Sequence, residues 1–408
     1  MKRYQWMGIM LSLVLLLCSC GTDKEVEKKA GESTSTPSAT ASVTPLISED
    51  EAFSEAEKIV KTMTIEQKVG QMFLVDLLQL DASPSVDGTA YKATDSMKQA
   101  IIDYHLGGVY LTKENIKSQK QTKKLVQNLQ ASVVSGSALY VAVEEDGGGE
   151  NSISAKVEDL KDTGYVTPKE MGQNMTANQI YESGKTIAGE LTKIGINLNL
   201  APVADLASDQ NPSYAMRCLG SDADGVADLL DDFVSGMREG GLSVTLKTFP
   251  GIGNVSADVT ESIAENTDSL MTIRDTNFVP YASGIQAGAD CVMVSNAAYR
   301  KLTVKKVPAF MSQDIVTKLL REELGFDGIV MTSPLNDNVI ENNYTNEFAV
   351  VDAVKAGCDL IVLPGNFKEC YEALITAVEE GRIDEKVINT SVRRILQNKI
   401  QRGILVLE

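Results

Sequence analysis

Apolar residues along this chain gather into eight short segments, and longer amphipathic stretches separate them. Within each segment the apolar positions are consecutive, which is typical of strands buried on both faces of a parallel sheet. The expected strands are residues 69–77, 107–112, 138–146, 196–206, 242–249, 291–297, 328–333 and 359–364. Helices are expected between them, at residues 173–194, 224–239, 311–324 and 367–380 among others.

Eight strand-then-helix units predict an α/β fold in which the sheet closes on itself, a TIM-type (β/α)8 barrel. We expect a single domain of this kind over residues 51–408, because 43% of the 408 residues are hydrophobic and can form a core of that size. Active sites of such barrels lie at the carboxyl ends of the strands. The positions of interest there are Asp76, Glu144–Gly149, Asp205, Lys247–Gly253, Asn296, Thr332–Asp337 and Pro364.

The first 19 residues have the pattern of a secretory signal peptide. Lys2 and Arg3 precede an apolar run at about residues 7–17, which is too short to span a membrane comfortably. The following Leu-Cys-Ser-Cys sequence resembles a bacterial lipobox, which implies cleavage before Cys20 and a lipid on its thiol. The protein is then expected to be extracytoplasmic and anchored to the bacterial cell membrane. An ordinary signal peptide with two incidental cysteines is the alternative.

Residues 20–50 are rich in Ser, Thr, Ala, Pro and charged residues and contain few large apolar ones. Such a segment cannot form a core, so it is expected to be a disordered tether between the lipidated cysteine and the barrel. The formal net charge is −18, and loss of Lys2 and Arg3 with the signal peptide would change it to −20. An acidic surface repels phosphate backbones, so a nucleic-acid partner is not expected.

Metal and cofactor chemistry is not expected. The only histidine, His105, precedes the second expected strand, at the face of the barrel opposite the active site, where a structural or surface role is favoured. Beyond the lipobox the chain has four cysteines, none with metal-ligand spacing, and we expect free thiols. These are Cys218, Cys291, Cys358 and Cys370. The glycine-rich residues 146–151 lack the Gly-Lys-Ser/Thr of a phosphate loop.

An ordered set of motifs over residues 55–405 resembles glycoside hydrolase family 3, in its single-domain β-N-acetylhexosaminidase branch. The motifs are MTIEQKVGQMF (63–73), GGVYLTKENI (107–116), GINLNLAPVADL (195–206), MRCLGSD (216–222), LKTFPGIG (246–253), GADCVMVSNAAY (288–299), LREELGFDGIVMTSPL (320–335) and SVRRILQNK (391–399). The resemblance implies a retaining glycosidase, in which one carboxylate attacks the anomeric carbon and a second group protonates the leaving oxygen.

The position of the family's nucleophile differs in this chain. In that branch an Asp follows the seventh strand in a Thr-Asp-x-Leu pattern, whereas this chain reads Thr-Ser-Pro-Leu at residues 332–335. Ser333 therefore takes the place of the nucleophile. A serine hydroxyl without an adjacent base is a weak nucleophile and carries no charge to stabilise an oxocarbenium-like transition state.

The acid/base position differs as well. The branch resembles Lys-His-Phe-Pro-Gly-His-Gly-Asp-Thr followed by a mobile Asp-Ser-His, whose histidine transfers the proton. This chain has LKTFPGIGNV at residues 246–255 and Asp258-Val259-Thr260 at the loop. Thr260 cannot protonate a leaving group near neutral pH, and Asp258 loses its histidine partner.

The residues that hold the sugar in the family are better kept. The resemblance assigns this role to Glu144, Arg217, Lys247 and Asp205, the last with a partly structural role in the family. Glu144 is one methylene longer than the family's Asp, and Gly149 replaces an arginine. The alternative role for Arg217 and Lys247 is to support the barrel rim through salt bridges with Asp205 or Glu144.

Three hypotheses follow. The first is a membrane-anchored pseudoenzyme that binds an amino-sugar glycan such as peptidoglycan. The second is a working β-N-acetylhexosaminidase with substitute carboxylates, Asp337 or Asp146. The third is an interaction module for another envelope protein. Asp327 precedes the seventh strand and is expected to be structural.

Overall fold

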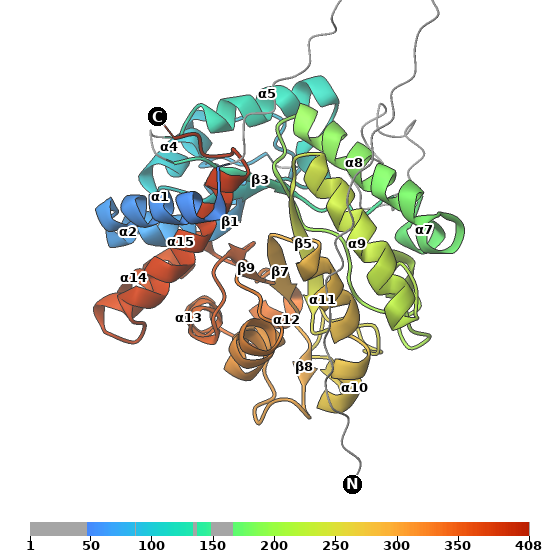
Figure 1. The fold of residues 1–408 in the computed structure, drawn as a ribbon. Coiled ribbons are helices and arrows are strands. Elements are labelled where there is room, and N and C mark those ends of the chain that lie inside the picture. Colours follow the sequence, from blue (N-terminus) through green and yellow to red (C-terminus); the bar gives the residue numbers. More distant parts are fainter. Residues whose placement is uncertain (1–46, 86, 134–136, 148–165, 408) are drawn as a thin grey trace, which may run out of the picture. The chain divides into compact units, whose positions relative to one another are not determined.

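The computed structural model describes residues 47–407, apart from residues 86, 134–136 and 148–165 (Figure 1). The expected signal peptide, Cys20, most of the tether and Gly149 lie outside the described residues. Residues 46–408 form one compact unit, and its first helix, α1 (Glu49–Thr62), begins close to the expected domain boundary at residue 51. Among the described residues, no helix has the length and apolar character needed to cross a membrane.

Eight parallel strands form the expected barrel (Figure 1). They are β1 (Phe73–Asp76), β2 (Gly108–Tyr110), β3 (Tyr140–Val143), β4 (Leu198–Asn199), β5 (Ser243–Phe249), β7 (Cys291–Val294), β9 (Ile329–Thr332) and β10 (Ile361–Val362). Neighbouring strands follow chain order from β1 to β9, and β10 pairs with β1. A parallel bridge between Met331 and Leu360 joins β9 to the start of β10, so the sheet closes.

Helices surround the strands, as Figure 1 shows. Besides α1 they are α2 (Ile65–Gln71), α3 (Leu77–Leu80), α4 (Asp95–Asp103), α5 (Gln119–Gln130), α7 (Pro168–Asn174), α8 (Ala177–Lys193), α9 (Ala223–Glu239), α10 (Leu270–Asp275), α11 (Phe278–Gln286), α12 (Asn338–Glu341), α13 (Asn346–Ala356), α14 (Phe367–Glu379) and α15 (Glu385–Gln401). Short 3-10 turns are η1 (Lys113–Asn115), η3 (Tyr214–Arg217) and η4 (Ala309–Met311). A small two-stranded sheet pairs β6 (Glu265–Asn266) with β8 (Ala298–Tyr299).

The strands are shorter than predicted, most of all β4, which has two residues where a strand over 196–206 was expected, and three helical segments also differ. The apolar run that begins at residue 69 is helical up to Gln71, and the strand starts at Phe73. The helix expected at 173–194 is two helices, because the Thr176 side chain caps a new helix by accepting from the Gln179 amide. The segment expected as a helix at 311–324 contains a π-helix, η5 (Asp314–Glu323).

The amino-terminal end of the barrel is covered by α15. Arg402, just after that helix, donates two hydrogen bonds to the Asp290 carboxylate, with N–O distances of 2.8 and 2.7 Å. Lys399 is fully buried and donates to Gln71 Oε1 and to the Gly107 carbonyl, both at 2.9 Å. This face is therefore held by polar contacts between α15 and the starts of the strands.

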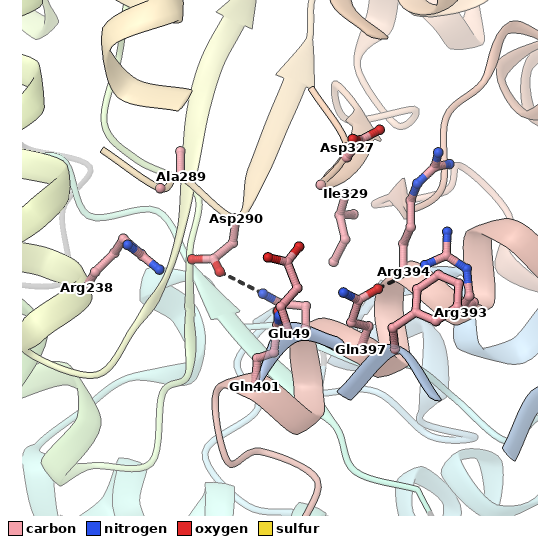
Figure 2. A pocket seen from close by; sticks show the side chains of 14 residues that line it. Glu49, Arg238, Ala289, Asp290, Asp327, Ile329, Arg393, Arg394, Gln397 and Gln401 are labelled. Atoms are coloured by element: carbon pink, nitrogen blue, oxygen red, sulfur yellow. Dashed lines mark hydrogen bonds between the residues drawn. The ribbon is translucent and has the colours of Figure 1, made fainter. Parts of the chain in front are cut away.

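A cavity of about 480 Å³ lies on this face beside α15 (Figure 2). Arg238, Asp290 and Arg394 are among the residues that line it, and Asp327 lies at its edge ahead of β9. His105 lies between α4 and β2, where its carbonyl accepts from the Gln71 side chain at 2.6 Å. The expected positions of His105 and Asp327, away from the carboxyl ends of the strands, are confirmed.

The cysteines that the structure describes are all buried and free: Cys218, Cys291, Cys358 and Cys370. Burial raises the pKa of each of these thiols. They act as small core hydrophobes, as the apolar runs around Cys291 and Cys358 predicted.

Candidate functional site

A cavity of about 740 Å³ opens among the loops that follow the carboxyl ends of the strands. It is lined by residues 110–114, Glu144, Leu200, residues 210–214, Arg217, Lys247, Thr248, Ile252, residues 256–260, Met293, Asn296, Ser333, Pro334 and Asp337. Six of the eight strands thus contribute to one site through their ends or the loops after them. Its volume is typical of small-molecule binding sites.

Most of the polar positions expected from the sequence meet in this cavity. Glu144, Arg217, Lys247, Asp258, Thr260, Asn296, Ser333 and Asp337 all line it. Asp76 and Pro364 are not among the lining residues. The Asp76 carboxylate instead caps α3 by accepting from the Leu78 amide at 2.7 Å, and the Pro364 carbonyl accepts from the Gln79 side chain.

One side of the cavity is a cluster of two cations and two carboxylates. Lys247 Nζ lies 2.7 Å from Glu144 Oε1, and Arg217 donates to the same oxygen. Arg217 also contacts Asp146 Oδ2, at 2.8 Å from Nε and 2.7 Å from the terminal nitrogen. Glu144, although one methylene longer than the family's Asp, contacts both cations. Lys247 and Arg217 therefore each have a carboxylate partner.

Electrostatics in this cluster follow from burial and from the pairing. Burial alone would raise the pKa of Glu144, but the Lys247 and Arg217 charges outweigh it and lower that pKa well below the usual range. Burial, together with the Arg217 charge, lowers the pKa of Lys247. The Lys247 side chain is only 4% exposed, whereas those of Glu144 and Arg217 are about one third exposed, at 37% and 35%.

Asp205 has a different environment from the other three residues expected to hold a sugar. It is fully buried and is not among the lining residues. Its carboxylate accepts from Thr248 Oγ1 at 2.8 Å, the Ile252 amide at 3.0 Å and the Tyr281 hydroxyl at 2.9 Å. Of the two partners expected for Arg217 and Lys247, Asp205 or Glu144, the structure shows salt bridges with Glu144. Asp205 instead anchors the loop after β5, which favours its structural role.

Ser333 lies directly after β9 and is 5% exposed. Its hydroxyl donates to the Val294 carbonyl at 2.9 Å, and its amide donates to the same oxygen at 3.0 Å. Val294 ends the neighbouring strand β7. The hydroxyl proton is therefore held by a backbone carbonyl, which is not a base.

The loop that carries Thr260 is held by its own contacts. The Thr260 hydroxyl and amide both donate to Asp258 Oδ1, at 2.7 and 2.9 Å. The Thr260 carbonyl accepts from the Val339 amide at 2.7 Å, which ties this loop to α12. Asp258 and Thr260 thus line the cavity beside α12, which follows β9 in the chain.

Asp337 lies four residues beyond Ser333 and faces the same cavity. Its Oδ2 accepts from Asn296 Nδ2 at 2.6 Å. Burial raises the pKa of Asp337 to about 7, the Asn296 hydrogen bond opposes the shift, and the charges of Asp258 and Glu144 add to it. A carboxyl group with such a pKa exists in both protonation states near neutral pH.

Tyr214 is a lining residue that the sequence analysis did not identify. It lies in η3, with its hydroxyl 3.2 Å from Thr248 Oγ1 and its ring 5.7 Å from the Arg217 guanidinium carbon. Its ring gives the cavity an aromatic surface. The sequence feature that could have identified Tyr214 is its position three residues before Arg217, just ahead of the motif at residues 216–222.

The described residues contain no group of three or more His, Cys, Asp or Glu side chains that could hold a metal ion. The polar part of the site consists of ion pairs, carboxylates and hydroxyls, beside the rings of Tyr110 and Tyr214. Such a surface is suited to a ligand that carries many hydroxyl or amino groups.

A family model described as "Glycosyl hydrolase family 3 N terminal domain" matches residues 64–398. Among curated proteins, β-hexosaminidase A of Pseudoalteromonas piscicida is 26% identical over 369 residues, which cover 83% of this chain and 61% of that protein. The β-hexosaminidase of Xylella fastidiosa strain M23 is 29% identical over 266 residues, which cover 64% of this chain and 77% of the relative. The chain thus spans about three fifths of the length of the Pseudoalteromonas relative.

Solved structures share the fold. A glycoside hydrolase family 3 β-N-acetylglucosaminidase from Paenibacillus sp. strain FPU-7 superposes with a TM-score of 0.75 at 29% identity, over 85% of this chain and 64% of that one. A β-N-acetylhexosaminidase from Beutenbergia cavernae gives a TM-score of 0.72 at 28% identity, over 83% and 98%. The family match over most of the chain and the shared barrel together show that this protein belongs to glycoside hydrolase family 3, with a β-hexosaminidase-like fold.

Proposed function

We propose that this protein is an extracytoplasmic, lipid-anchored member of family 3 that binds an amino-sugar glycan such as peptidoglycan and has lost most or all hydrolysis. The observation that carries the proposal is the environment of Ser333. Its hydroxyl stands at the position that the resemblance assigns to the nucleophile, and it donates to the Val294 carbonyl. A neutral hydroxyl without a base cannot replace a carboxylate in attack on an anomeric carbon.

The acid/base position supports the same conclusion. Thr260 stands where the resemblance places the histidine, and its hydroxyl donates to Asp258. A threonine hydroxyl cannot supply a proton to a leaving oxygen near neutral pH, so a second step of the family mechanism is also impaired.

Features for sugar binding support the other half of the proposal. Arg217, Lys247 and Glu144 line one cavity together with the Tyr214 ring. Their charges are positioned before a ligand arrives, because Glu144 contacts both cations. Membrane anchoring rests on the lipobox-like sequence before Cys20, which is a separate sequence argument.

A second candidate function, a weakly active β-N-acetylhexosaminidase, is favoured by one observation. Asp337 lines the cavity near Ser333 with a pKa raised to about 7, which suits a general acid. Asp146, the other substitute carboxylate, is paired with Arg217.

Hydrolysis of a chromogenic N-acetyl-β-glucosaminide by the purified full-length protein tests both candidates. We expect no turnover above background from the wild type or from Asp337→Ala and Asp146→Ala. We also expect none from Ser333→Asp, because the proton donor is still missing. Calorimetry with N-acetylglucosamine oligosaccharides should show saturable binding, and Lys247→Ala should weaken it.

Two results would contradict the proposal in different ways. Turnover by the wild type that Asp337→Ala or Asp146→Ala removes would establish the second function. Absence of binding to every amino-sugar oligosaccharide offered would remove the binding function itself.

A further inference from the structure

The charged residues at the cavity include two clusters, each named here as a side of the cavity: Lys247, Arg217, Glu144 and Asp146 form one, and Asp337 and Asp258 belong to the other. On one side the two cations, Lys247 and Arg217, are already paired with Glu144 and Asp146. On the other side, Asp337 and Asp258 line the cavity without a salt bridge among the described residues. The charged groups that act most strongly on Asp337 are Asp258, Glu144 and Glu261, all of them carboxylates. The electrostatic potential at Asp337 is therefore negative.

Hydrogen-bond acceptors on the same side also lack donors. Asn296 lines the cavity and is only 1% exposed, and its Oδ1 has no hydrogen-bond partner among the described residues. Its Nδ2 is used by Asp337 Oδ2, at 2.6 Å, whereas Asp337 Oδ1 accepts no hydrogen bond from the described part of the chain. A buried acceptor without a donor is unfavourable, so a ligand that brings donors is favoured here.

The ligand group that fits is an organic cation. An ammonium group has three N–H donors, no acceptor and a positive charge, which matches a set of acceptors under negative potential. A metal ion is not indicated, because the described residues contain no group of three metal-binding side chains. An N-acetyl group would instead offer one donor, an acceptor and no charge.

We propose that the side of the cavity formed by Asn296, Asp337 and Asp258 recognises the free amine of a hexosamine unit, so that the protein prefers glycans with glucosamine-type residues over fully N-acetylated ones. This inference rests on the proposed glycan binding. The inference adds that the glycan bound in this cavity carries a positively charged amine.

Binding of two matched trisaccharides to the full-length protein at pH 7 tests this inference. One is β-1,4-linked glucosamine, and the other is its fully N-acetylated counterpart. We expect the glucosamine trisaccharide to bind at least about tenfold more tightly, because a charged hydrogen bond contributes roughly 1.5–3 kcal/mol. Asp337→Asn should remove this preference, so that the variant binds the two trisaccharides with affinities within about twofold of each other.

Glu261→Gln is the matched control. Glu261 follows Thr260 in the chain, and its carboxylate accepts a hydrogen bond from Asn338. Glu261 does not line the cavity, so the variant should keep the preference. Equal loss in Glu261→Gln and Asp337→Asn would assign the preference to the acidic surface and overturn the inference. Equal or tighter binding of the N-acetylated trisaccharide would also overturn it, while the proposed glycan binding would stand. If neither trisaccharide binds, both fail together.

Discussion

At the scale of single residues, the barrel contains a buried lysine that has no carboxylate partner in the part of the chain that the structure describes. Lys399 is fully buried, donates to Gln71 and to the Gly107 carbonyl, and lies 4.8 Å from the centre of the Tyr140 ring. Burial lowers its pKa to about 7 from an ordinary value of 10.5. The amine therefore releases its proton in the folded protein at a lower pH than in the unfolded chain.

Substitution of this lysine should change how stability depends on pH. Below pH 7 both states bind the proton, and the folded state carries the full cost of a buried charge. Between pH 7 and 10.5 the unfolded chain binds more protons, so the free energy of unfolding rises with pH. Relative to wild type, Lys399→Met should therefore be most stable near pH 6 and lose that advantage towards pH 9, as measured by urea unfolding.

The exposed Lys386 provides the control for this prediction. Lys386→Met should differ from wild type by the same small amount at every pH. A Lys399→Met difference that stays constant from pH 6 to pH 9 would show that the amine keeps its ordinary pKa in the folded protein. Loss of the hydrogen bonds to Gln71 and Gly107 changes the free energy of unfolding by the same amount at every pH, so it does not alter the pH dependence.

At the scale of elements, α8 and α9 pack through glycines. A Cβ added at Gly236 would lie 2.0 Å from the Tyr181 carbonyl oxygen, and one added at Gly184 would lie 2.6 Å from the Phe233 carbonyl oxygen. Contacts this short involve backbone atoms, which cannot move without shifting a helix. Gly189, also in α8, has no atom within 4 Å of an added Cβ.

These two environments predict opposite effects of the same substitution. Gly236→Ala should destabilise the protein by about 1–3 kcal/mol or more, because it forces the two helices apart. Gly189→Ala should stabilise it by up to roughly 1 kcal/mol through higher helix propensity. Thermal unfolding of both variants checks the prediction. A midpoint for Gly236→Ala at or above that of wild type would contradict the close packing described here.

At the scale of the whole molecule, one buried carboxylate fastens the seam that closes the barrel. The seam between β9 and β10 is formed by the bridge between Met331 and Leu360 and by backbone hydrogen bonds around it. Asp359, 1% exposed at its side chain, pairs there with Arg321 of η5 and Arg394 of α15. It also accepts from the Val330 amide at 2.9 Å. Asp359 thus joins two strands and two helices that are distant in the sequence.

Loss of this charge should weaken the closed barrel as a unit. Asp359→Asn leaves two nearly buried guanidinium groups without a counter-charge, which costs about 3–5 kcal/mol. Glu323→Gln, which removes an exposed pair with Arg274, should cost at most about 1 kcal/mol. Urea denaturation measures both. Equal effects of the two substitutions would show that the seam does not depend on Asp359.

The sequence alone determined the strands, the barrel and the family. Consecutive apolar runs mark strands buried on both faces, and this signal is local, so all eight strands were predicted. Boundaries were less certain where a helix meets a strand, as at residues 69–72, because apolar residues suit both elements. The topology then brought the strand ends together, so Lys247 and Ser333 were expected at one site before any distance was known.

Only the tertiary structure decided which groups contact each other within that site. The pairing of Lys247 and Arg217 with Glu144, the use of the Ser333 hydroxyl by Val294, and the contact of Asn296 with Asp337 join residues 39 to 103 positions apart. Such contacts depend on side-chain directions and on distances of a few ångströms. A pattern of residue types along the chain does not specify these directions and distances, whereas the closed barrel does, because it fixes the positions of the strand ends.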